Sequence, residues 1–125
     1  MTIVVAYADT PQGHAALRYA GGLSRTLGEP IVLAAAEHHG EVSPDRAREI
    51  LAQVEGHDGV EKITVADSQL HDPSDRVIQV AQEVEASHIV LGLRHRSPVG
   101  KLLLGSTAQR ILLDAGCPVV AVKAN

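Results

Sequence analysis

The sequence has almost no aromatic residues, since it contains no Phe, no Trp and only two Tyr among its 125 residues. The apolar residues, 45% of the chain, are therefore nearly all aliphatic. Proteins that bind single-stranded nucleic acid commonly stack the bases on aromatic side chains. We therefore predict an aliphatic core, and we do not expect nucleic acid to be a partner.

Cysteine, basic charge and long apolar runs are also scarce. Cys117 is the only cysteine, so an internal disulfide is excluded. The formal net charge is -4, which disfavours attraction to DNA or to an anionic membrane. No apolar run approaches the roughly 20 residues that span a bilayer, and the first residues lack the pattern of a signal peptide. We expect a cytoplasmic protein with no membrane partner.

The usual motifs of metal-dependent and nucleophilic enzymes are missing too. The seven histidines form no His-Glu-x-x-His pattern, and neither a Gly-x-Ser-x-Gly elbow nor a Walker loop occurs. Asp9 is interpreted as a turn or capping acid rather than a metal ligand. We predict no metal site and no catalytic residue, with a weak nucleotide hydrolase as an alternative.

Short β-branched runs alternate with longer stretches that have apolar residues three and four positions apart. Three helices are expected to start at a capping residue followed by proline, and the fourth at Gly105-Ser106-Thr107. That fourth helix is expected to turn Ala108, Ile111, Leu112 and Ala115 inward. The caps are Thr10-Pro11, Ser43-Pro44 and Asp72-Pro73, and the expected strands are 3–7, 31–36, 61–66, 87–91 and 119–122.

Five strands alternating with four helices predict one α/β domain over residues 1–125, a parallel sheet with helices on both faces. In such sheets ligands bind outside the carboxyl ends of the strands, where the strand order reverses. If the order is 3-2-1-4-5, the reversal lies between the first and fourth strands. The loops 8–10 and 92–107 would then face each other.

The second of these loops carries the strongest functional signal. It reads Gly92-Leu93-Arg94-His95, then nine residues, then Gly105-Ser106. A helix that starts near Ser106 offers free backbone N–H groups and a partial positive charge to an anion. Arg94, Arg96 and Lys101 add positive charge. The alternative is a solvated loop with nothing bound, in which Gly92 ends a strand and Ser106 caps a helix.

This loop resembles the signature of the universal stress protein family: glycine, two residues, glycine, nine residues, glycine, then serine or threonine. The resemblance extends over essentially the whole chain, through Ala15-Ala16-Leu17, Asp72-Pro73 and the ending Pro118 to Lys123. It implies a five-stranded parallel sheet of order 3-2-1-4-5, of the Rossmann-like, adenine nucleotide alpha hydrolase-like type. It also implies a non-catalytic protein that helps cells survive stress.

The resemblance further implies where a nucleotide would bind, because some members of the family bind ATP and others do not. Matched to this sequence, the positions that face the phosphates are Gly92, His95, Gly105, Ser106 and Thr107. The positions on the adenosine side are Ala6, Ala8 and Ala35, with Asp9 beside them. ATP or another adenine nucleotide is therefore the expected cofactor.

Two departures from the family pattern bear on that pocket. His95 stands where ATP-binding members have their second glycine, and it either fills the phosphate space or, when protonated, donates to a phosphate. Ala8-Asp9-Thr10 stands where binders read aspartate, glycine, serine, so the carboxylate has either moved by one position or been lost.

The last strand is a candidate sheet edge, and exposed edges favour pairing. The family resemblance implies a homodimer in which this strand aligns with its copy. The strand comprises Val119, Val120, Ala121 and Val122. An alternative function is therefore a dimeric interaction module whose nucleotide pocket is closed. The alternative for the last strand is that a loop or tail covers its edge and no second copy pairs with it.

Overall fold

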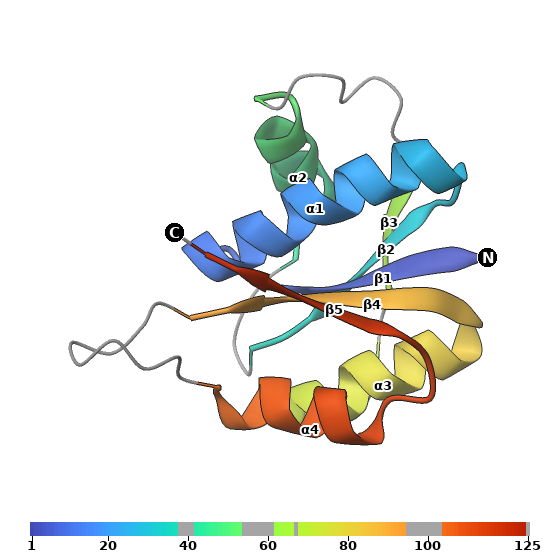
Figure 1. Cartoon of the computed structure of the whole chain (residues 1–125), viewed down its shortest axis with the longest axis vertical. Helices are drawn as coiled ribbons and strands as arrows, with labels where there is room; N and C mark the ends of the chain where they lie inside the picture. The colour runs from blue at the N-terminus through green and yellow to red at the C-terminus, as the bar shows by residue number, and fades with distance from the viewer. Residues whose placement is uncertain (38–41, 54–61, 67, 95–103, 125) are drawn as a thin grey trace.

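The computed structural model describes residues 1–37, 42–53, 62–66, 68–94 and 104–124 (Figure 1). Strands and helices alternate along the chain. The strands are β1 (Thr2–Tyr7), β2 (Ile31–Ala35), β3 (Ile63–Val65), β4 (Ala86–Leu93) and β5 (Val119–Lys123). The helices are α1 (Pro11–Leu27), α2 (Pro44–Leu51), α3 (Pro73–Glu83) and α4 (Ser106–Asp114).

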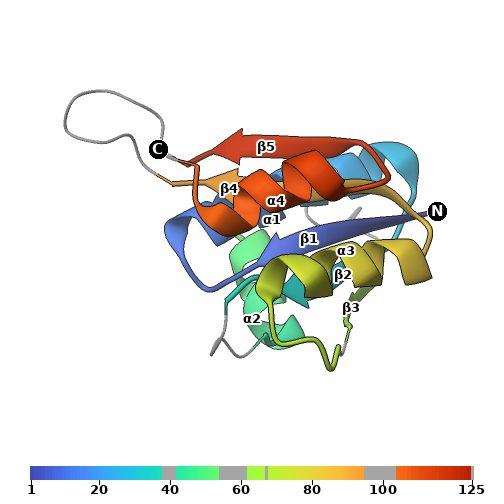
Figure 2. The same ribbon diagram turned by 90° about the horizontal axis from the view of Figure 1, so that it is seen from below.

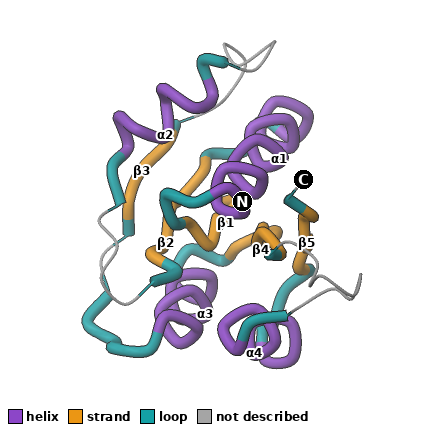
Figure 3. Tube along the Cα trace, turned by 90° about the vertical axis from the view of Figure 1, so that its left-hand side faces the viewer, coloured by secondary structure: helices purple, strands orange, loops and turns teal. Residues whose placement is uncertain are grey.

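The strands form one parallel sheet in the order β3-β2-β1-β4-β5, which confirms the predicted fold class. Helices α1 and α2 cover one face, and α3 and α4 cover the other (Figure 3). The neighbouring strands β1 and β4 therefore lead into helices on opposite faces, α1 and α4 (Figure 3). In the described ranges, no helix is long and apolar enough to cross a membrane.

Two aliphatic layers hold the helices to the sheet. On the α1 and α2 side the most buried residues include Ile3, Leu17 and Ile50; on the other side they include Val4, Val77 and Ile111. Tyr7 is buried in the first layer, whereas Tyr19 is 47% exposed. Because β1 alternates its side chains between both layers, it lies at the centre of the core.

Three helices begin at the predicted caps. The Thr10 hydroxyl accepts a hydrogen bond from the Gly13 amide at 3.1 Å, and Ser43 accepts one from Arg46 at 3.3 Å. The Asp72 carboxylate accepts from the Ser74 and Asp75 amides. Each cap is followed by proline at the first helical position, where no N–H is needed.

The structure differs from the sequence prediction in several places. Gly92 does not end the fourth strand, because β4 continues to Leu93 and Gly92 pairs with Val122. Gly105, not Ser106, is the N-cap of α4, and no side chain bonds to that end. Leu112 is 39% exposed rather than inward, since α4 lies over the edge of the sheet and packs mainly through Ile111 (Figure 2).

Gly92 is needed for a close contact with the first turn of α1. A Cβ atom at this position would lie 1.9 Å from the backbone oxygen of Gln12. The absence of a side chain therefore lets the start of α1 lie directly against the end of β4. This contact brings the ends of β1 and β4 and the start of α1 to one place on the carboxyl edge of the sheet.

Candidate functional site

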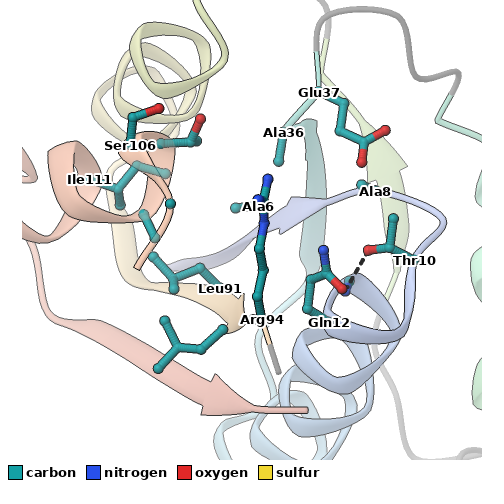
Figure 4. A pocket seen from close by; sticks show the side chains of 16 residues that line it. Ala6, Ala8, Thr10, Gln12, Ala36, Glu37, Leu91, Arg94, Ser106 and Ile111 are labelled. Carbon is teal, nitrogen blue, oxygen red and sulfur yellow. Dashed lines mark hydrogen bonds between the residues drawn. The ribbon is translucent and has the colours of Figure 1, made fainter. Parts of the chain in front are cut away.

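A hollow opens at the carboxyl edge of the sheet, between the ends of β1 and β4 (Figure 4). The empty space within it is about 690 Å³, a volume that includes the solvent at its open side. The start of α1 and residues after β2 form one wall, and the start of α4 forms another. Its lining comprises Ala6, Ala8, Thr10, Gln12, Gly13, Ala36, Glu37, Leu91, Gly92, Leu93, Arg94, Gly105, Ser106, Thr107, Ala108 and Ile111.

Most of the residues predicted from the sequence lie together in this hollow. Its lining includes Ala6, Ala8, Gly92, Gly105, Ser106 and Thr107. Ala35 does not; it lines a separate hollow beside β3, and its neighbour Ala36 takes the expected place. His95 lies outside the described residues, so its two alternative roles remain predictions.

Asp9 lies next to the hollow but does not line it. One carboxylate oxygen is 2.5 Å from His14 Nε2, and the other accepts from Arg46 Nε at 3.4 Å. The hydrogen bond with His14 is the main cause that lowers the pKa of the Asp9 carboxyl, and Arg46 lowers it further. The carboxylate therefore links α1 to α2. The sequence left open whether this carboxylate has moved by one position or been lost; in the structure it does not line the hollow.

The N-terminus of α4 lines the hollow without a side-chain cap. The first helical hydrogen bond runs from the Gln109 amide to the Gly105 oxygen at 3.0 Å. The amides of Ser106, Thr107 and Ala108 precede it, and these positions have no acceptor within a helix. Together with the helix dipole, they make this wall favourable for negative charge.

Ion pairs with α3 help to fix the position of α4. Arg110 Nη2 lies 2.6 Å from an Asp75 carboxylate oxygen, and Nη1 lies 3.8 Å from Asp72. Both acids belong to the start of α3, one as its N-cap. Because these side chains are half-exposed, the pairs contribute mainly to orientation rather than to stability.

Three polar residues complete the lining, and the sequence analysis missed two of them. Arg94, which it named for its charge, extends its side chain into the hollow (Figure 4). Gln12 comes from the first turn of α1, and Glu37 follows β2. Their positions in the sequence could have identified Gln12 and Glu37, because both follow closely after strands that end at the carboxyl edge of the sheet.

The described lining brings several kinds of chemical group together. It combines small apolar side chains with an arginine, helix amides, hydroxyls and one carboxylate. Among the described residues, no group of three or more His, Cys, Asp or Glu side chains could hold a metal ion.

Comparisons with known proteins give consistent results. The model of the Universal stress protein family matches residues 1–123. A universal stress protein of Mycolicibacterium smegmatis is 35% identical over 134 residues, which cover 97% of this chain and 96% of the relative.

Solved structures are similar over the same length. A universal stress protein from Archaeoglobus fulgidus superimposes with a TM-score of 0.70 at 30% identity, covering 98% of both chains. The structure of the universal stress protein from Archaeoglobus fulgidus in complex with dAMP gives a TM-score of 0.66 at 26% identity, again covering 98% of both chains.

Proposed function

This chain belongs to the universal stress protein family, and on that premise we propose that the hollow between β1 and β4 binds an adenine nucleotide. The observation that carries the proposal is that small apolar residues and an anion-attracting wall meet in one hollow. The protein then acts in the stress response as a nucleotide-binding, non-catalytic component. We place it in the cytoplasm, where such nucleotides are available.

The alanine side of the hollow suits the base and ribose. Ala6, Ala8 and Ala36 line it from the ends of β1 and β2. Their short side chains leave room for a flat ring against the sheet edge, and Gln12 and Glu37 offer polar groups beside it (Figure 4). A few placed polar groups beside apolar side chains fix the orientation of a ligand in small-molecule sites.

The α4 side suits the phosphates. The uncapped amides at the start of the helix and the Arg94 guanidinium both favour an anion. Support for the adenine class comes from the neighbour of known structure, which has this fold and forms a complex with dAMP. We extend that ligand class to this chain as part of the proposal.

Absence of catalysis is also part of the proposal. Hydrolysis of a nucleotide generally requires a metal ion or a group that positions the attacking water. The described lining holds a single carboxylate, Glu37, and Asp9 beside it has both carboxylate oxygens engaged by His14 and Arg46. Nucleotide binding without turnover therefore agrees with the described side chains, and magnesium-dependent phosphate release would contradict it.

A thermal-shift titration with AMP, ADP and ATP tests nucleotide binding. A ligand at a hundred times its Kd stabilises the folded state by about 2.7 kcal/mol, which raises Tm by about 10 °C for a domain of this size. We expect Gly105→Val to abolish the shift, because its side chain enters the hollow beside Arg94.

The matched control is Gly116→Val, beyond the other end of α4, where an added Cβ meets nothing within 4 Å. It should retain the full shift. No shift for the wild type with any of the three nucleotides, or equal shifts in both variants, would contradict the proposed pocket.

A second function, homodimerisation through Val119, Val120, Ala121 and Val122, is favoured by the position of β5. It is the last strand of the sheet, and among the described strands it pairs with β4 alone. The Ala124 amide donates to Leu93 and the Pro118 oxygen accepts from Ile89, so alternation along the strand turns the Ala121 amide outward. An outward row of backbone groups favours pairing with a second copy.

Sedimentation equilibrium of two variants tests this dimer. Ala121→Pro removes an outward N–H while leaving the groups that face β4, a placement of proline that edge strands tolerate. We expect it to be monomeric, and we expect Ala121→Thr, which keeps the N–H, to remain dimeric. A monomeric wild type, or a dimeric proline variant, would overturn pairing through β5.

A further inference from the structure

Arg94 follows β4 directly, and its side chain occupies the middle of the hollow (Figure 4). Its guanidinium approaches the start of α4 from there. A Cβ atom built on Gly105 would lie 3.8 Å from Arg94 Cζ and Nε and 3.9 Å from Nη2. The guanidinium therefore lies at van der Waals distance from the position that a side chain on residue 105 would occupy.

The guanidinium of Arg94 forms no hydrogen bond or ion pair with the residues that the structure describes. Two other arginines differ from it in this respect, because Arg46 pairs with Asp9 and Arg110 pairs with Asp75. Glu37, the carboxylate in the same lining, lies on the side of the hollow away from Ser106 (Figure 4). Arg94 thus presents up to five N–H donors to the hollow.

The space between Arg94 and α4 exists because residue 105 has no side chain. The backbone angles of Gly105, φ -64 and ψ 161, are open to any residue, and an added Cβ would make only ordinary contacts with Arg94. Neither backbone strain nor packing among the described residues requires glycine here. Space beside a guanidinium that no described residue engages fits an anionic group.

We infer that Arg94 is the residue by which this pocket selects a phosphorylated nucleotide over the neutral nucleoside. Its guanidinium contacts the phosphate nearest to the ribose, in the space that Gly105 leaves open. Glu37 repels the phosphate from the opposite side, so the ligand binds in one orientation. The inference rests on the proposed nucleotide pocket and adds the residue that determines its specificity.

Calorimetric titration with AMP and with adenosine tests this role in the full-length protein. We expect the wild type to bind AMP at least tenfold more tightly than adenosine, and Arg94→Gln to bind both with similar affinity. Its adenosine affinity should stay within about twofold of the wild type. The preference of Arg94→Lys for AMP should lie between those of the wild type and Arg94→Gln, because lysine keeps the charge but lacks the planar fork of donors.

Arg25→Gln, the same substitution at an exposed arginine in the last turn of α1, is the control and should keep the full preference for AMP. Three results would overturn the role of Arg94. If Arg94→Gln keeps the preference for AMP, the proposed pocket stands and Arg94 does not select. If it weakens both ligands equally, Arg94 supports the shape of the pocket and does not contact the phosphate. If the wild type binds neither ligand, the proposed nucleotide pocket fails as well.

Discussion

Asp9 illustrates at the scale of one residue how a position that resembles a ligand-binding acid can serve the fold. Its carboxylate bridges His14 in α1 and Arg46 in α2. The hydrogen bond with His14 lowers the pKa of this carboxyl in the folded state. An acid whose pKa falls on folding stabilises the protein above its unfolded pKa of about 3.9, and this stability is lost as the pH falls through the folded pKa.

Asp9→Asn should therefore lower Tm at pH 7 and flatten the decline of Tm on the acid side of the profile. The reason is that the amide keeps the shape of the side chain but cannot lose a proton. Scanning calorimetry between pH 7 and pH 3 measures both effects. Asp45→Asn, at a side chain that is 92% exposed, is the control. Parallel profiles for the wild type and Asp9→Asn would mean that the bridge contributes nothing to acid stability.

Residues differ in how far the sequence predicts them. Ala6, Gly92 and Thr107 could be placed near one another because each occupies a position at the end of a strand or the start of a helix. The partner of Asp9 could not be predicted, since Arg46 lies 37 residues away and meets it only through the packing of α2 beside α1. The direction of the Arg94 side chain likewise depends on the distance between β4 and α4.

Among the elements, α1 has the clearest start and end. Thr10 caps its first turn, and Gly28 ends it in the left-handed region with φ 66, where its amide donates to the Ser24 oxygen. A residue with a Cβ atom is strained in this conformation by roughly 1 to 2 kcal/mol. An added Cβ on Gly28 would meet nothing within 4 Å, so backbone strain is the only expected cost.

Gly28→Ala should therefore lower the free energy of unfolding by about 1 kcal/mol, measured by urea denaturation. Gly116→Ala, at a position equally free of contacts but without a positive φ, should change it by less than half as much. Equal effects in the two variants would show that conformational strain does not explain the glycine at the end of α1.

Elements whose boundaries depend on local chemistry were predicted well. Thr10, Ser43 and Asp72, each followed by proline, begin the three helices predicted there, because these side chains satisfy free amides and proline fits the first turn. Boundaries set by neighbours were predicted less well. Gly92 continues β4 because β5 pairs with it there, and Leu112 is exposed because the sheet edge leaves α4 little surface to cover.

At the scale of the whole molecule, the strand order determines where the candidate site lies. The strand order β3-β2-β1-β4-β5 sends α1 and α4 to opposite faces of the sheet (Figure 1). The hollow lies between the ends of β1 and β4, from which these two helices start. The family, the fold class and the reversal between the first and fourth strands were all predictable from alternating apolar patterns and one glycine motif. The choice of nucleotide was not, because it depends on side-chain directions across the hollow.

The most direct test of the account is backbone amide chemical-shift mapping while AMP is added to the labelled protein. We predict saturable shifts at the amides of Ala8, Gly92, Gly105 and Thr107, which line the proposed pocket. The amides around the separate hollow at Ala35 and Val65 should shift far less. Shifts centred on that second hollow, or a spectrum unchanged at millimolar AMP, would contradict a nucleotide site between β1 and β4.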